Sequence, residues 1–188
     1  MRQKLSENYR CVFLNSPPMV DEMHGYLIAA GVDVTQESER GSLVLSSERD
    51  HLANGRFDPD RMMTMLSDAL AKARRDGFQG LWATGDMTWE FGPEKNFAKL
   101  FEYECLLEDF FRNHPGLSGI CQYHADTLPH DALRQGLASH QAYFTNETLA
   151  RINPHYLPRV AVATGTPMSA TLDRALERLL APPGRHSD

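Results

Sequence analysis

Four short apolar runs, each followed by a segment with helical spacing, constrain the fold more than any other feature of this sequence. The runs are Cys11–Leu14, Ser42–Ser46, Gln79–Thr84 and Leu117–Tyr123. Short apolar runs bounded by turn residues predict buried strands. Strands that alternate with helices predict an α/β domain with a mostly parallel sheet. We therefore expect three layers, with helices on both faces of the sheet.

The remaining segments are assigned from periodicity, caps and helix breakers. Asp58-Pro59 is a strong helix start, because Asp caps the first turn and Pro suits its first position. Gly77 ends that helix. Other helices are expected at Met19–Ala30, Glu94–Asn113, Pro129–Ser139 and Met168–Leu180, and extended segments at Val32–Val34, Ala142–Thr145 and Arg159–Ala163. The buried stripe of the helix over 94–113 is predicted as Phe97, Leu100, Phe101, Cys105, Leu106 and Phe110.

Chain length and composition fit a globular protein. A chain of 188 residues with 41% apolar and 23% charged residues fits one domain with a single core. The net charge is −6 and no basic run exceeds Arg74-Arg75, so we expect no direct binding of nucleic acid. No apolar run approaches the roughly 20 residues that span a bilayer. Together with three widely spaced cysteines, this predicts a cytoplasmic protein with reduced thiols and no membrane contact.

The segment Thr84-Gly85-Asp86 places an acid at the end of a predicted parallel strand. Nucleotide hydrolases hold magnesium with an acid in this position. Their phosphate loop, G-x-x-x-x-G-K-[ST], is missing, because Asp-Met follows Gly80 and Gly85 where Lys-Ser/Thr would stand. Asp86 thus has two interpretations, a former catalytic acid and a helix-cap or turn carboxylate.

The only two tryptophans, Trp82 and Trp89, lie on either side of that acid. Trp82 is within the strand and is predicted to pack in the core. Trp89 falls in a predicted loop just past the strand end, where aromatic rings line pockets for apolar ligands.

Other candidate residues carry weaker signals. Glu104 precedes the apolar Cys105 and is expected to point inward, while Glu102 and Glu108 are expected on a solvated acidic face. His140 is more simply a structural hydrogen-bond partner than a catalyst. Cys121 and His124 could form half of a metal site, but no second half with ligand spacing follows, so no metal is expected.

Several short motifs in order resemble one family of sensory domains. They are Gly55-Arg-Phe-Asp-Pro59, Gly77-Phe-Gln-Gly-Leu81, Thr84-Gly85-Asp86 with Trp89, Tyr103-Glu104, Cys121-Gln-Tyr123 and His140-Gln141. The series, over about Cys11 to Phe144, resembles the MEDS domain (methanogen/methylotroph, DcmR sensory domain). That family occurs in bacterial and archaeal signalling proteins and is thought to sense small molecules, hydrocarbon derivatives among them. Its fold is similar to RecA/KaiC-type ATPase domains without the phosphate-loop chemistry.

The resemblance implies one sensory domain over residues 1–188, with a core at 11–145, an extension at 146–180 and a loose tail at 181–188. It implies a ligand site without cofactor or catalytic residues, formed by Asp86, Trp89, Tyr103, Glu104, Cys121, Tyr123 and His140. Two departures from the family pattern stand out. The first βα unit is absent or shortened, and Leu81-Trp82 replaces a frequent Leu-Arg, which makes the expected pocket more apolar.

Three functions follow as hypotheses. The first is a non-catalytic sensor of a small apolar ligand that acts on a signalling partner such as a kinase or regulator. The second is an interaction or dimerisation module, because a sheet that has lost a unit exposes an edge. The third is a remnant nucleotide hydrolase that uses Asp86 or Glu104 with magnesium.

Overall fold

The computed structural model describes residues 1–93, 97–146, 149–153, 156–157 and 170–180. The chain forms two compact units. Unit 1 comprises Met1–Asn96 and Phe110–His124, and unit 2 comprises Phe97–Asp109 and Ala125–Asp188. The single domain expected over 1–188 stays a prediction.

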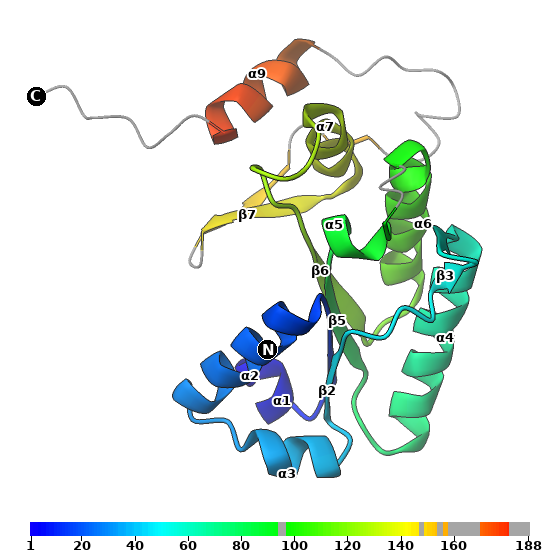
Figure 1. The fold of residues 1–188 in the computed structure, drawn as a ribbon, viewed down its shortest axis with the longest axis vertical. Coiled ribbons are helices and arrows are strands. Elements are labelled where there is room, and N and C mark those ends of the chain that lie inside the picture. Colours follow the sequence, from blue (N-terminus) through cyan, green and yellow to red (C-terminus); the bar gives the residue numbers. More distant parts are fainter. Residues whose placement is uncertain (94–96, 147–148, 154–155, 158–169, 181–188) are drawn as a thin grey trace, which may run out of the picture. The chain divides into compact units, whose positions relative to one another are not determined.

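A parallel four-stranded sheet forms the centre of unit 1, which confirms the predicted α/β class (Figure 1). Its strand order is β2-β1-β5-β6, with bounds Leu43–Ser46, Arg10–Leu14, Leu81–Asp86 and Leu117–Gln122. The chain moves from β1 to one side for β2 and to the other side for β5 and β6. The strand order therefore reverses between β1 and β5, and sheets of this kind bind ligands beyond the carboxyl ends of the strands at such a point.

Helices cover both faces of this sheet, as predicted. Helices α1 (Arg2–Ser6), α2 (Pro17–Ala29) and α3 (Val34–Glu39) lie on one side, and α4 (Pro59–Arg75) lies on the other (Figure 1). Beneath α1 to α3 is a core of Leu5, Cys11, Leu27, Val34 and Leu43, with Met1, Met23, Val32, Leu45 and Trp82 packed against it. The predicted core role of Trp82 is confirmed.

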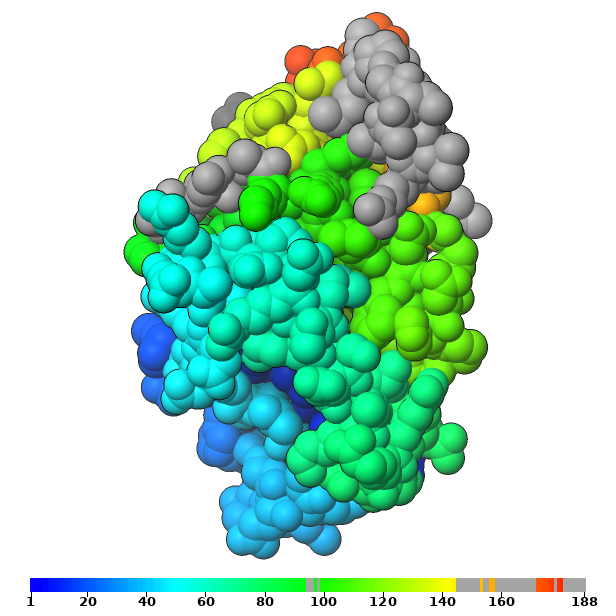
Figure 2. Space-filling model, turned by 90° about the vertical axis from the view of Figure 1, so that its right-hand side faces the viewer, coloured from blue at the N-terminus to red at the C-terminus, as the bar shows by residue number. Residues whose placement is uncertain are grey.

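Helix α4 begins as its sequence predicts. The Asp58 side chain accepts a hydrogen bond from the Arg61 amide at 3.2 Å, and Pro59 opens the first turn. Its buried residues recur every three or four positions, at Pro59, Met62, Leu66, Leu70 and Ala73. Figure 2 shows this side of unit 1, where the teal residues of α4 occupy the centre of the view and a small patch of dark-blue N-terminal residues is visible beside them.

A tight hairpin precedes α4. Strands β3 (Leu52–Ala53) and β4 (Arg56–Phe57) pair antiparallel around Asn54-Gly55, whose φ angles are 51° and 79°. Two successive residues with positive φ give the turn whose twist suits a two-residue hairpin, and Asn-Gly is its preferred sequence. The hairpin fixes the positions of His51, just before β3, and Phe57, within β4.

The prediction of an extended segment at Val32–Val34 is wrong. Asp33 instead caps α3 by accepting from the Gln36 amide at 3.0 Å. The polar segment Thr35–Glu39 continues that helix, and only Val34 of the helix is buried. A capping Asp thus overrides the β-branched flanks that suggest a strand.

Unit 2 contains α7 (His130–Ser139), the antiparallel pair β7 (Ala142–Asn146) and β8 (Leu149–Ile152), α9 (Ala170–Leu180) and most of α6 (Leu100–Asn113). A 3-10 turn, Phe97–Lys99, precedes α6. Strand β8 is not among the elements that the sequence predicts. The predicted strand Arg159–Ala163 and the tail 181–188 lie outside the described residues.

Within unit 2, α7 packs against α9, the last described helix of the chain. Helices α7 and α9 pack together, with Leu133, Leu137, Leu172 and Leu176 buried. Arg134 on α7 pairs with Asp173 on α9, at 2.5 Å between Nε and Oδ1.

The buried stripe of α6 differs from the predicted one. The buried residues are Leu100, Tyr103, Glu104, Cys105 and Leu107, whereas Phe101, Leu106 and Phe110 are half-buried. The stripe 100, 103, 104, 107 is regular for a helix. The predicted stripe is right for Leu100 and Cys105 and wrong for Phe101, Leu106 and Phe110, because the buried face is turned toward Tyr103, Glu104 and Leu107. None of the described helices is long and apolar enough to cross a membrane.

Candidate functional site

Asp86 ends β5 at the carboxyl edge of the sheet and begins α5 (Met87–Glu90). One of its oxygens accepts from the Thr88 amide at 2.7 Å, and the other lies 3.3 Å from Nε2 of His124. Only 8% of the residue is exposed. Asp86 is therefore a helix-cap carboxylate, in line with one of its two interpretations.

Strand β5 is fixed to β6 at the same edge by side chains. Thr84 Oγ1 donates to the carbonyl oxygen of Ile120 at 2.7 Å, and Gln122 Nε2 donates to Thr84 Oγ1 at 2.8 Å. These bonds hold the strand that carries Asp86 in register with its neighbour. The start of α5 is thus placed by both backbone pairing and side-chain hydrogen bonds.

Trp89 lies in α5 and not in the loop that the sequence predicts. The cap at Asp86 turns the chain into a helix immediately after β5. This helix carries Trp89 inward, so that only 5% of the residue is exposed. Trp89 is therefore a buried helical residue and not a residue of an exposed loop.

Four rings form a chain of contacts beyond the strand ends, and we refer to His51, Phe57, Trp89 and Phe91 as the aromatic group. The His51 and Trp89 ring centroids are 5.2 Å apart, and the Phe57 and Phe91 rings stack at 4.1 Å. The His51 and Phe57 centroids are 6.4 Å apart in an edge-to-face arrangement. Two rings come from the hairpin region and two from the segment after β5. The group is therefore assembled just past the carboxyl ends of β2 and β5.

The hairpin and the α5 segment also meet through their backbones. Gly92 follows the aromatic group with φ 68°, and a Cβ there would lie 3.0 Å from Leu52 Cδ1 and 3.2 Å from the Gly55 carbonyl oxygen. A side chain at Gly92 would therefore push the hairpin away. Glycine allows the two segments of the aromatic group to pack closely.

His51 is fully buried within the group. Its Nε2 lies 2.8 Å from the Glu90 carbonyl oxygen. Because a carbonyl can only accept, Nε2 carries the proton of this bond. Burial lowers the pKa of His51 below its ordinary value of 6.5, since little solvent remains to stabilise the charged ring. His51 is therefore a neutral imidazole near neutral pH, with its lone pair at Nδ1.

Glu90 is the second buried acid of this region, and only 4% of it is exposed. A Cβ at Gly85 would overlap the Glu90 carboxylate. The carboxylate thus lies directly against the backbone of β5, in the space that a larger residue would fill. A larger residue at position 85 would oblige the Glu90 carboxylate to move.

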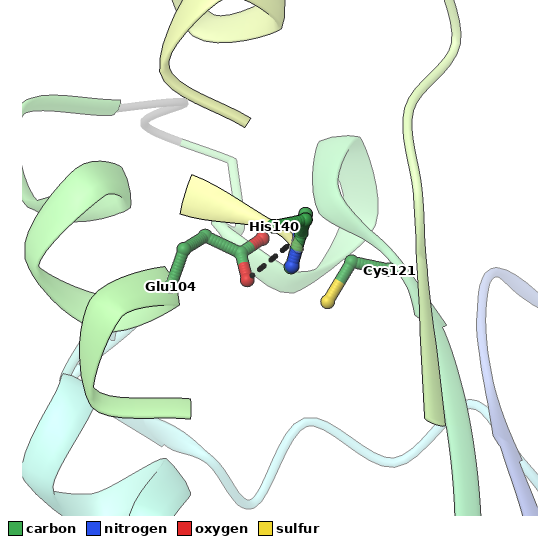
Figure 3. Close-up of side chains that lie close together, drawn as sticks. All are labelled: Glu104, Cys121 and His140. Atoms are coloured by element: carbon green, nitrogen blue, oxygen red, sulfur yellow. Dashed lines mark ion pairs between the residues drawn. The ribbon is translucent and has the colours of Figure 1, made fainter. Parts of the chain in front are cut away.

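Unit 2 holds a separate set of charged side chains, Glu104, Glu108 and His140. Glu104 is completely buried, and its Oε2 lies 3.3 Å from His140 Nε2 (Figure 3). Glu108 Oε2 lies 3.7 Å from the other ring nitrogen. The inward orientation predicted for Glu104 is confirmed. Glu108, expected on a solvated face, instead lies beside His140, and its side chain is only 12% exposed.

Asn153 holds His140 in place. Its Nδ2 donates to the carbonyl oxygens of Leu137 at 2.5 Å and His140 at 2.7 Å. These carbonyls end α7, where the helix leaves acceptors without intrahelical donors. The Asn153 amide also donates to the Gln141 carbonyl oxygen at 2.8 Å. The backbone of His140 is thus fixed by a residue that lies outside every helix and strand predicted from the sequence.

The seven predicted site residues divide between the two units. Asp86, Trp89, Cys121 and Tyr123 belong to unit 1, and Tyr103, Glu104 and His140 belong to unit 2. Tyr103 is buried, and Cys121 and Tyr123 are half-buried. Of these seven, the Glu104–His140 contact is a direct pairing within one unit, and a common pocket for all seven stays a prediction.

His51, Phe57, Glu90 and Phe91 are not among the site residues that the sequence predicts. Asn54-Gly55 between Leu52 and Phe57 is a usable signal, because it specifies a hairpin that returns Phe57 toward His51. No local pattern marks Glu90 as buried.

The sequence also matches a family model. The model is described as "MEDS: MEthanogen/methylotroph, DcmR Sensory domain", and the match covers residues 1–141. No curated protein and no solved structure matches the chain.

Proposed function

Because the chain belongs to the MEDS family of sensory domains, we propose that it is a non-catalytic sensory module that binds a small, mostly apolar ligand at the aromatic group. The single observation that carries this proposal is the placement of His51, Phe57, Trp89 and Phe91 beyond the strand ends. Ligand sites of α/β sheets occupy this edge. The group lies after β5, one of the two strands between which the strand order reverses.

Apolar and polar features of the group suit a small ligand. Phe57, Phe91 and Trp89 offer flat apolar faces, and the Arg49 guanidinium lies 5.5 Å from the Trp89 ring centre. Binding sites are mostly apolar, with a few placed polar groups that fix orientation. Asp86 supports the site indirectly, because it caps the helix that carries Trp89. Its cap role favours sensing over hydrolysis.

Thermal melting and tryptophan fluorescence test the proposal with a panel of small metabolites and organic solvents. A ligand present at one hundred times its Kd is expected to raise Tm by about 5–10 °C for a chain of this length. Trp89→Phe is expected to weaken the response and Trp82→Phe to preserve it, because Trp82 packs in the core under α1 to α3. The proposal fails if no compound shifts Tm or if both variants respond alike.

A second candidate function is self-association or binding of a signalling partner. The observation that favours it is exposed apolar surface on α2, where Tyr26 is 63% and Ile28 is 54% exposed. Strand β2 is also an edge of the described sheet, and open edges favour pairing with another chain. Size exclusion with light scattering would give the mass of a dimer if the chain pairs with itself, and a monomer mass would contradict that form of the proposal.

A further inference from the structure

Two polar ring atoms of the aromatic group are buried without a hydrogen bond. They are Nδ1 of His51 and Nε1 of Trp89, and neither has a partner within the part of the chain that the structure describes. The exposed fraction is 0% for His51 and 5% for Trp89. Buried polar groups are nearly always satisfied in folded proteins. Two such atoms on neighbouring rings therefore require an explanation.

The two atoms have opposite hydrogen-bonding characters. Nε2 of His51 already donates to the Glu90 carbonyl oxygen, so Nδ1 of the neutral ring can only accept. The Trp89 indole nitrogen can only donate. The ring centroids are 5.2 Å apart, so one acceptor and one donor are carried by neighbouring rings. A hydroxyl is the smallest functional group of an organic ligand that can both donate and accept a hydrogen bond.

We propose that the aromatic group binds a small neutral molecule with a hydroxyl group on an aliphatic body. The hydroxyl donates to His51 Nδ1 and accepts from Trp89 Nε1–H, and the aliphatic body packs on Phe57 and Phe91. This inference rests on the proposed sensory function and narrows its ligand class. Simple alkanes and alkyl halides would leave the histidine acceptor unsatisfied. A carboxylate has no donor for that acceptor at neutral pH.

Asn15 offers a further polar group for a ligand at this edge of the sheet. Asn15 follows β1 at the same edge of the sheet, is fully buried, and has no partner for its Nδ2 among the described residues. Its Oδ1 is used, since it accepts from the Ser16 amide at 2.7 Å. The ends of β1 and β5, between which the strand order reverses, thus both carry an unused buried donor.

The test compares n-propanol, n-propyl chloride and propionate as matched probes on Trp82→Phe protein, in which Trp89 is the only tryptophan. We expect n-propanol to shift Trp89 fluorescence at concentrations about tenfold or more below those of the other two, since a satisfied buried acceptor is worth at least that factor. His51→Phe keeps a ring but removes the acceptor, and is expected to abolish the preference. His51→Gln keeps a donor and an acceptor, and is expected to restore part of it.

A second readout does not depend on a folded variant. In NMR spectra of protein with labelled histidine nitrogens, the His51 Nδ1 signal should move toward the hydrogen-bonded position on addition of n-propanol and stay fixed with n-propyl chloride. Equal responses to the three probes, or an unmoved Nδ1 signal, would overturn the hydroxyl inference while leaving an apolar sensory site intact. If the metabolite and solvent panel also shifts neither Tm nor fluorescence, the proposed function fails as well.

Discussion

At the scale of single residues, His51 shows how burial and one backbone contact together fix a protonation state. The Glu90 carbonyl oxygen holds the proton at Nε2, and burial disfavours a second proton at Nδ1. The same residue could not be selected from the sequence, because a lone histidine beside a turn has no distinctive pattern. His51 joins the aromatic group only because α5 packs against the hairpin in the folded protein.

The depressed pKa of His51 predicts a loss of stability in mild acid. Unfolded chains take up a proton at His51 near pH 6.5, whereas the folded protein takes it up only at a lower pH. The free energy of unfolding therefore falls as pH drops below about 6.5, and the His51 contribution is fully present above that value. Urea denaturation of wild type and His51→Gln at several pH values below 6.5 gives the free energy of unfolding at each pH. This free energy should fall less steeply with decreasing pH in the variant. Equal slopes would contradict a neutral buried His51.

Glu104 carries a second prediction at this scale. Its buried carboxylate faces His140, and Glu104→Gln keeps the shape while removing the charge. We expect the free energy of unfolding to fall by about 1–3 kcal/mol, because the amide of the variant satisfies the buried contact with His140 less well than the carboxylate does. Glu102→Gln on the same helix is the matched control, since Glu102 is exposed, and should change stability by about 0.5 kcal/mol or less. Equal effects in chemical denaturation would show that burial of Glu104 contributes nothing.

At the scale of elements, close backbone contacts at the start of the strands set the geometry of the sheet. A Cβ at Gly80 would overlap the Gly116 carbonyl, and that carbonyl accepts from the Leu81 amide at 2.8 Å. Arg10 ties the same end of the sheet to α4 through Asp76, at 2.6 Å. These contacts fix the strands relative to one another at their amino ends. They therefore also fix the relative positions of the carboxyl ends, which carry the proposed site.

Two glycine substitutions test this element-scale packing. Gly80→Ala should destabilise the protein by about 1–3 kcal/mol, because backbone atoms must move to admit the methyl group. Gly25→Ala on α2 should instead stabilise it by about 0.5–1 kcal/mol, since nothing lies within 4 Å of the position that an added methyl group would take and alanine favours helix. Thermal melting of both variants measures the difference in sign. A neutral Gly80→Ala would show that β5 and the segment before β6 are not closely packed.

Elements with strong local signals are predictable, and those decided by distant contacts are not. Strands β1, β2, β5 and β6 and helix α4 follow from apolar runs and an Asp-Pro cap. The buried face of α6 is only partly predicted from sequence. Leu100, Cys105 and the inward Glu104 are expected, whereas the position of Glu108 depends on His140, far along the chain. Helix α5 escapes prediction because four residues carry too little periodicity, although Asp86 two residues before Thr88 is a capping arrangement.

At the scale of the whole molecule, the parallel sheet and the aromatic group together carry the functional conclusion. The family resemblance is predictable from ordered short motifs and is confirmed over residues 1–141. Trp89 is predicted as a pocket wall, but His51 and Phe57 are not predicted beside it, since they come from the hairpin region more than thirty positions earlier. Sequence reasoning thus locates the strand end and misses the side chains that face it.

The most direct measurement is the indole N–H region of the NMR spectrum, recorded with the compound that raises Tm most. The chain has two tryptophans, so two signals are assigned with Trp82→Phe and Trp89→Phe. If the ligand binds at the aromatic group, the Trp89 signal moves with ligand concentration and the Trp82 signal stays in place. A ligand that raises Tm while leaving the Trp89 signal unmoved would contradict a sensory site at this position.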